Sequence, residues 1–138
     1  MAFDMGKIVK PICRIGSGAG FAGDRIDPAV ALAASGEVDA IALECLAERT
    51  LVPAIKARLE SPEAGADPRL RRRLRPLLPV AVQTKCKIIS NLGAANPIAA
   101  GGAISALGKE LNIKGFVWQR LRAMMSPASL KLLIGNDL

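Results

Sequence analysis

The chain has 138 residues, 51% hydrophobic and 22% charged, which predicts a single globular domain, 1–138, with a core of its own. Histidine is absent, and this excludes a Ser-His-Asp triad, a Cys-His pair and a His-based zinc site built from this chain alone. No apolar run approaches the roughly 20 residues that a membrane helix needs, and no secretory signal pattern precedes the first motif, so we expect a cytoplasmic protein without membrane contact.

The cysteine content also supports a cytoplasmic location. Cys13, Cys45 and Cys86 are odd in number, far apart in the chain and without metal-ligand spacing. A reducing compartment fits this usage best, and we predict no metal site.

Charge is divided unevenly between the two halves of the chain. Residues 1–67 carry a net charge of −3 and residues 68–138 a net charge of +10. The densest run is Arg69, Arg71, Arg72, Arg73 and Arg75. Nucleic-acid binding would favour aromatic stacking residues beside these arginines, and none is present. We therefore interpret the run as the solvated face of a helix whose inward face carries Leu70, Leu74, Leu77 and Leu78, with contact to an acidic partner domain as the next alternative.

Strand and helix patterns alternate along the chain. Short apolar strands are expected at residues 12–15, 38–43, 87–90 and 130–134. Helices are expected from Asp27 to Gly36 and over residues 50–59, the second with Thr50 as its cap. A third helix should begin at residue 70 and stop or kink at Pro76 and Pro79, and a fourth should cover residues 97–111. The segment 116–129 fits either an amphipathic helix or an apolar flap.

This alternation, with strands that are apolar on both faces, predicts an α/β fold. We expect a parallel sheet flanked by helices, in a Rossmann-like three-layer arrangement. Four segments follow the strands: 16–23, 44–49, 91–96 and 135–137. Right-handed crossovers would bring all four to one edge of the sheet, where ligands bind in such folds.

The first of these segments is rich in glycine. Gly18, Gly20 and Gly23 match the spacing of a dinucleotide-binding loop, with Gly16 just before them. Bare glycine amides can approach a phosphate closely. Asp24 places negative charge where a pyrophosphate would lie, although Arg25 can offset it. A glycine-rich turn that binds no phosphate is the alternative.

Several ordered motifs resemble one family. They are residues 14–25 (RIGSGAGFAGDR), 44–50 (ECLAERT), 62–65 (PEAG) and 91–97 (NLGAANP). The match spans residues 12–115 and resembles the N-terminal domain of the acyclic terpene utilisation A proteins, a family of unknown function. Residues 116–129 diverge from it.

The resemblance implies a role in acyl-CoA and terpene catabolism, with a CoA thioester or a nucleotide bound at the glycine-rich loop. Because family members are longer, it also implies that this chain is an incomplete N-terminal portion of a larger domain. The remainder of that domain, or another subunit, would then be a partner.

Polar residues after the second predicted strand are further candidates. Glu44 and Glu48 could act as acid or base, and Arg49 could bind an anion. The alternative is a helix start with solvated charges. Cys45 could be a nucleophile, but without histidine to activate it a small buried residue is the better interpretation.

Asn91 and Asn96 frame the small residues after the third predicted strand. Their amides could bind a carbonyl or phosphate group of a ligand, whereas the alternative gives Asn96 a purely capping role. The candidate cofactor-binding residues are therefore Gly16, Gly18, Gly20, Gly23, Asp24, Arg25, Arg49, Asn91 and Asn96.

Three functions remain open at this stage. The first is a domain that binds a CoA thioester or nucleotide. The second is a non-catalytic fragment or interaction module that docks on a partner chain. A basic nucleic-acid binder ranks last.

Overall fold

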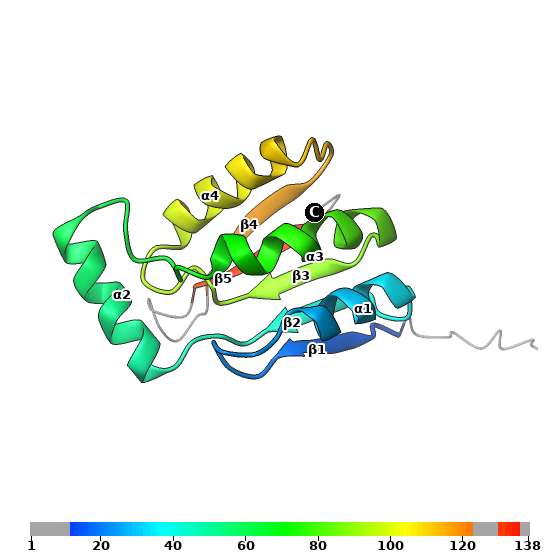
Figure 1. Ribbon diagram of the computed structural model, residues 1–138, viewed down its shortest axis with the longest axis horizontal. Coiled ribbons are helices and arrows are strands. Elements are labelled where there is room, and N and C mark those ends of the chain that lie inside the picture. Colours follow the sequence, from blue (N-terminus) through cyan, green and yellow to red (C-terminus); the bar gives the residue numbers. More distant parts are fainter. Residues whose placement is uncertain (1–11, 123–129, 136–138) are drawn as a thin grey trace, which may run out of the picture.

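The computed structural model describes residues 12–122 and 130–135, which form one sheet and a set of helices (Figure 1). In chain order the elements are β1 (Ile15–Ala19), α1 (Asp27–Ser35), β2 (Ala40–Leu43), α2 (Glu48–Glu60), α3 (Leu70–Thr84), β3 (Lys87–Ser90), α4 (Pro97–Glu110), β4 (Val117–Arg122) and β5 (Leu130–Gly135). Within the described residues, no helix is both long and apolar enough to cross a membrane.

The sheet is mixed, with the strand order β1-β2-β3-β5-β4. β1, β2 and β3 are parallel, whereas β5 runs antiparallel to both β3 and β4. The prediction of an all-parallel sheet was therefore wrong. Residues 123–129 join β4 to β5, and so short a link favours a hairpin because a parallel crossover needs about a dozen residues or more.

The helices α1, α3 and α4 lie on one face of the sheet (Figure 1). Each step from β1 to β2 to β3 moves in the same direction, and right-handed crossovers place their helices on the same face. The described residues thus form two layers, and the predicted Rossmann-like three-layer arrangement is not observed. On the other face, Ile15 and Val117 are 61% and 46% exposed.

Helix α3 supplies the centre of the core. Its predicted leucine face is confirmed, since Leu70, Leu74, Leu77 and Leu78 are all buried. The helix does not end at Pro76 or Pro79 but continues to Thr84. Both prolines are on the exposed side, where water can satisfy the carbonyl groups that lose their helical partners.

The segment that begins at Phe116 forms a strand rather than a helix, and two glycines of α4 receive its aromatic rings. A Cβ atom on Gly101 would lie 2.3 Å from the Trp118 ring, and one on Gly108 would lie 2.1 Å from the Phe116 ring. The indole Nε1 of Trp118 also donates to the Ser105 hydroxyl at 3.0 Å. The rest of the segment, residues 123–129, lies outside the described residues.

Other boundaries agree with the sequence to different degrees. β3 and α4 are as predicted, with the Asn96 side chain accepting from the Ala99 amide at 3.2 Å, and Gly36 ends α1 in the left-handed conformation. β1, however, begins at Ile15 and ends at Ala19, so the strand includes residues that we assigned to the glycine-rich loop.

Two helix starts also differ from the prediction. Asp27 is the first residue of α1 and does not cap it, because its carboxylate is paired with Arg25. Helix α2 begins before Thr50, whose hydroxyl accepts the Ala47 amide at 2.9 Å from a position inside the first turn. Pro53 lies inside α2.

The packing of Trp118 on α4 can be tested with two neighbouring glycines. Gly101→Ala should destabilise the fold by about 1–3 kcal/mol because the new methyl group collides with the indole. Gly102→Ala is the matched control, since no atom lies within 4 Å of its Cβ position, and it should stabilise the helix by about 0.5–1 kcal/mol. Chemical denaturation of both variants gives the comparison, and equal effects would contradict the packing argument.

Candidate functional site

Three of the four predicted segments meet at one edge of the sheet, beyond the carboxyl ends of β1, β2 and β3. The Glu44 amide donates to the Ala19 carbonyl at 3.0 Å, and the Cys45 amide donates to the Asn91 side chain at 2.7 Å. The fourth segment is elsewhere. Because β5 is antiparallel, Gly135 pairs with Val117 at the opposite edge of the sheet, and residues 136 and 137 lie outside the described residues.

Gly16 and Gly18 belong to β1 and face α1. A Cβ atom at Gly16 would lie 2.4 Å from Leu32 of α1, and one at Gly18 would lie 2.5 Å from Ile41 of β2 and 3.0 Å from Ala29 of α1. At these distances a side chain at either position would force α1 away from the strand or disturb the neighbouring strand β2. In the structure these two glycines therefore serve the close packing of α1 on the sheet.

The loop proper begins at Gly20, and its first amides already have an anionic partner. The Asp24 carboxylate accepts from the Gly20 amide at 2.6 Å and from the Phe21 amide at 3.3 Å. Gly23 accommodates the Phe21 ring, which would lie 2.4 Å from an added Cβ. With Asp24 in this position, a phosphate at the loop has to find its main partners elsewhere.

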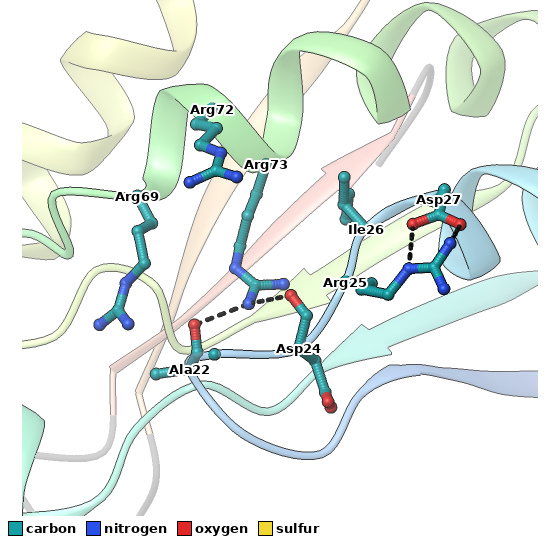
Figure 2. A pocket seen from close by; sticks show the side chains of 9 residues that line it. Ala22, Asp24, Arg25, Ile26, Asp27, Arg69, Arg72 and Arg73 are labelled. Carbon is teal, nitrogen blue, oxygen red and sulfur yellow. Dashed lines mark hydrogen bonds and ion pairs between the residues drawn. The ribbon is translucent and has the colours of Figure 1, made fainter.

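Such partners lie in a neighbouring hollow of about 350 Å³, which we call the arginine hollow (Figure 2). One wall is the loop of residues 22–27, and the other is the start of α3. The three arginines Arg69, Arg72 and Arg73 extend from α3 towards the loop, and Arg25 lies on the loop side (Figure 2).

Most arginines of this region have a carboxylate partner. Asp67, whose side chain is only 5% exposed, accepts from both the amide and the side chain of Arg69, and Asp27 pairs with Arg25. Outside the hollow, Arg71 and Arg75 both bind Glu110 on α4. Arg72 makes no ion pair within the described residues.

Arg73 differs from these arginines because it is buried and its hydrogen-bond partners are backbone carbonyls. Its side chain is buried, with the residue 4% exposed, and its Nη2 donates to the carbonyl oxygens of Ala22 and Asp24 at 2.7 Å each (Figure 2). Its Nη1 is buried and is without a hydrogen-bond partner among the described residues. Burying a cation without a counter-charge is costly, and an anion bound nearby would offset part of this cost.

The prediction that all the arginines face outwards was therefore wrong at Arg73. The sequence contained a signal for this, because Arg73 is three residues after Leu70 and four before Leu77, inside the leucine face. What the helical spacing could not supply is the pair of loop carbonyls that receive its Nη2.

The helix itself adds to the positive potential. The arginines lie around the N-terminus of α3, where the helix dipole is positive, and the first turn has no acidic residue. Cations are disfavoured at this end of a helix, while anions are stabilised there. Together with the buried charge of Arg73, this makes the arginine hollow a candidate anion site in the described part of the chain.

Glu44 and Asn91 form a fixed pair near the ends of β2 and β3. The Asn91 amide donates to the Glu44 carboxylate at 2.7 Å, and the same carboxylate accepts from the Leu46 amide at 3.1 Å. Asn91 also accepts from Cys45, so both ends of its amide have protein partners. The structure thus brings Glu44 and Asn91 together in a network that shapes the edge of the sheet.

Cys45 is buried beside this pair. Burial raises the pKa of its thiol, although the positive charge of Arg73 acts in the opposite direction. A buried neutral thiol is a poor nucleophile. The geometry agrees with the interpretation of Cys45 as a small core residue.

Asn96 joins two of the family motifs. Besides capping α4, its amide donates to the carbonyls of Pro62 and Ala64 at 2.7 and 2.8 Å, so its side chain is fully used within the protein. Glu48 and Arg49, by contrast, are exposed in the first turn of α2. The structure does not join these two to the arginine hollow.

No group of three or more His, Cys, Asp or Glu side chains that could bind a metal ion exists within residues 12–122 and 130–135.

These features define a two-layer α/β domain with a basic hollow at the carboxyl edge of its parallel strands. The family model of the acyclic terpene utilisation family protein AtuA matches residues 13–117, and the chain belongs to this family. The resemblance seen in the sequence motifs is thereby confirmed. Comparison with curated proteins gave no match, and neither did comparison with solved structures.

The reactivity of the cysteine thiols can test whether Cys45 and Cys86 are buried as described. All three cysteines are free, but only Cys13 is exposed, and burial raises the pKa of both the Cys45 and the Cys86 thiols. A disulfide reagent at pH 8 should therefore modify one thiol rapidly in the folded protein and three after denaturation. Cys13→Ser should remove the rapid phase, and a rapid phase that survives in this variant would contradict the burial of Cys45 and Cys86.

Proposed function

We propose that this domain binds a phosphate-bearing small molecule, either a nucleotide or a CoA thioester, in the arginine hollow beside the glycine-rich loop. The observation that carries the proposal is the buried guanidinium of Arg73, whose Nη1 has no hydrogen-bond partner in residues 12–122 and 130–135. A buried ion that is incompletely paired at a concave surface is typical of a functional site rather than of a structural one.

The hollow would act through charge rather than through bare glycine amides. Arg72 has no carboxylate partner within the described residues and can contact an anion directly, while Arg69 and Arg25 are held in place by Asp67 and Asp27. Guanidinium groups suit phosphate because they donate two parallel hydrogen bonds. The volume of about 350 Å³ suits a phosphate group with part of the molecule that bears it.

Membership of the AtuA family supports a place in acyl-CoA or terpene catabolism, and with the free cysteines it supports a cytoplasmic location. As for chemistry, Glu44 remains our candidate acid or base, because hydrogen bonds fix its carboxylate at the same edge of the sheet. Glu48, being exposed on α2, would need the ligand to extend beyond the hollow.

The binding proposal can be tested by calorimetric titration with coenzyme A, ATP and inorganic phosphate. Arg73→Met should weaken binding at least tenfold, since it removes a buried positive charge beside the hollow together with its charge-assisted hydrogen bonds to the loop, each worth about 1.5–3 kcal/mol. Arg72→Met should weaken it several-fold and, because the side chain is exposed, should leave the fold intact.

Arg75→Met is the matched control. It removes the same charge from the same helix, but its side chain faces Glu110 on α4 instead of the hollow. Binding should change less than twofold in this variant. If Arg72→Met and Arg75→Met weaken binding equally, the effect is one of net charge and the proposal fails; it also fails if none of the three probes binds.

A second candidate function is an interaction module that docks on a partner chain, such as the remainder of a longer family protein. It is favoured by the second face of the sheet, which no helix among the described residues covers and where Ile15 and Val117 are exposed. Light scattering of the purified chain distinguishes this candidate, since a monomer that unfolds cooperatively would speak against a need for a partner.

A further inference from the structure

A larger groove adjoins the arginine hollow, and the family motifs do not explain it. It lies between α2 and the segment of residues 63–71 and has a volume of about 580 Å³. Its walls consist largely of small apolar residues, and we call it the alanine groove. Those that form its lining are Ala54, Ala57, Ala64, Ala66, Ala94 and Ala103.

The groove exists because α2 touches the rest of the molecule without packing into it. None of the residues of α2 is buried. The helix comes closest at Gly65, where an added Cβ would lie 2.9 Å from the Arg58 Cβ and 3.1 Å from the Ala54 carbonyl oxygen. Gly65 also has a φ of +102°, which favours glycine, and Arg58 donates to the Ala95 carbonyl. The two alanines on this side of α2, Ala54 and Ala57, are half-buried and line the groove.

The alanine groove and the arginine hollow share Arg69 as a common wall. Asp67 fixes this side chain through two hydrogen bonds of 3.0 and 3.2 Å to its Nε and Nη2. The two hollows are therefore neighbours, with cations on one side of Arg69 and apolar carbon on the other. Such an arrangement complements a molecule with an anionic head and a hydrocarbon chain.

We propose that the alanine groove binds an aliphatic chain whose phosphate-bearing head group occupies the arginine hollow. This rests on the anion site proposed above and adds the class of molecule that the anion belongs to. Small side chains leave room for the chain, and apolar contact with the alanines replaces its contact with water. Arg49, at the rim of the groove on α2, has no ion pair within the described residues and can screen a second anionic group.

A series of n-alkyl phosphates tests the proposal, because the head group stays constant while the chain grows. Calorimetry with methyl, butyl, hexyl and octyl phosphate, all below their aggregation limits, should show affinity rising about two- to fourfold for each added methylene group. Constant affinity from methyl to octyl phosphate would overturn the proposal.

Variants locate the effect. Ala57→Leu places a larger side chain in the groove and should abolish the gain with chain length, while the affinity for methyl phosphate stays the same. Ala34→Leu makes the same change on the exposed side of α1, away from the groove, and should leave the whole series unaltered. A gain with chain length that persists in Ala57→Leu would show that the chain binds elsewhere, and the proposal would be wrong.

The two proposals fail in different ways. If methyl phosphate binds and Arg72→Met weakens it but chain length has no effect, the anion site stands and the groove proposal falls. If no member of the series binds, both are overturned.

Discussion

Close approach of α1 to the sheet is the constraint on which the site depends. Gly16 and Gly18 give the helix room to lie against β1, where any side chain would meet Leu32 or Ala29 of α1. This contact sets the path of the chain from the end of β1 into α1, and so the position of the loop carbonyls of Ala22 and Asp24. Arg73 reaches those carbonyls from α3 and joins the two helices through the loop. The glycine pattern that resembles a phosphate-binding fingerprint thus serves first to let α1 pack closely on the sheet. This packing in turn positions the buried side chain of Arg73.

Most charged side chains around the arginine hollow are paired, and Arg73 is the buried exception. Asp67, Asp27 and Glu110 each neutralise one or two arginines, and Asp24 uses its carboxylate to satisfy the amides of its own loop. Among the residues that the structure describes, Arg73 has only neutral hydrogen-bond partners, and its Nη1 has none. Exposed ion pairs contribute little to the stability of the fold, whereas a buried ion without a counter-charge is destabilising. Arg73 therefore indicates a site more strongly than the paired arginines do.

The sequence predicted local elements well and long-range arrangement less well. The leucine spacing of α3, the Asn-Pro start of α4 and the apolar run of β3 are local signals, and each is confirmed. The mixed sheet was missed because strand direction depends on the link between β4 and β5, and no periodicity encodes that. The burial of Arg73 was missed for a related reason: the helix pattern placed it beside leucines, but the carbonyls that accept its hydrogen bonds come from residues about 50 positions away.

The packing of Trp118 against α4 has a practical consequence. It is the one tryptophan of the chain, and the chain has no tyrosine, so near-ultraviolet emission arises almost wholly from this indole. Its ring rests on Gly101 and its nitrogen binds Ser105. Emission wavelength and quenching should therefore report selectively on whether β4 is docked against the helical layer, so the protein carries an intrinsic optical probe where its outermost antiparallel strand meets α4.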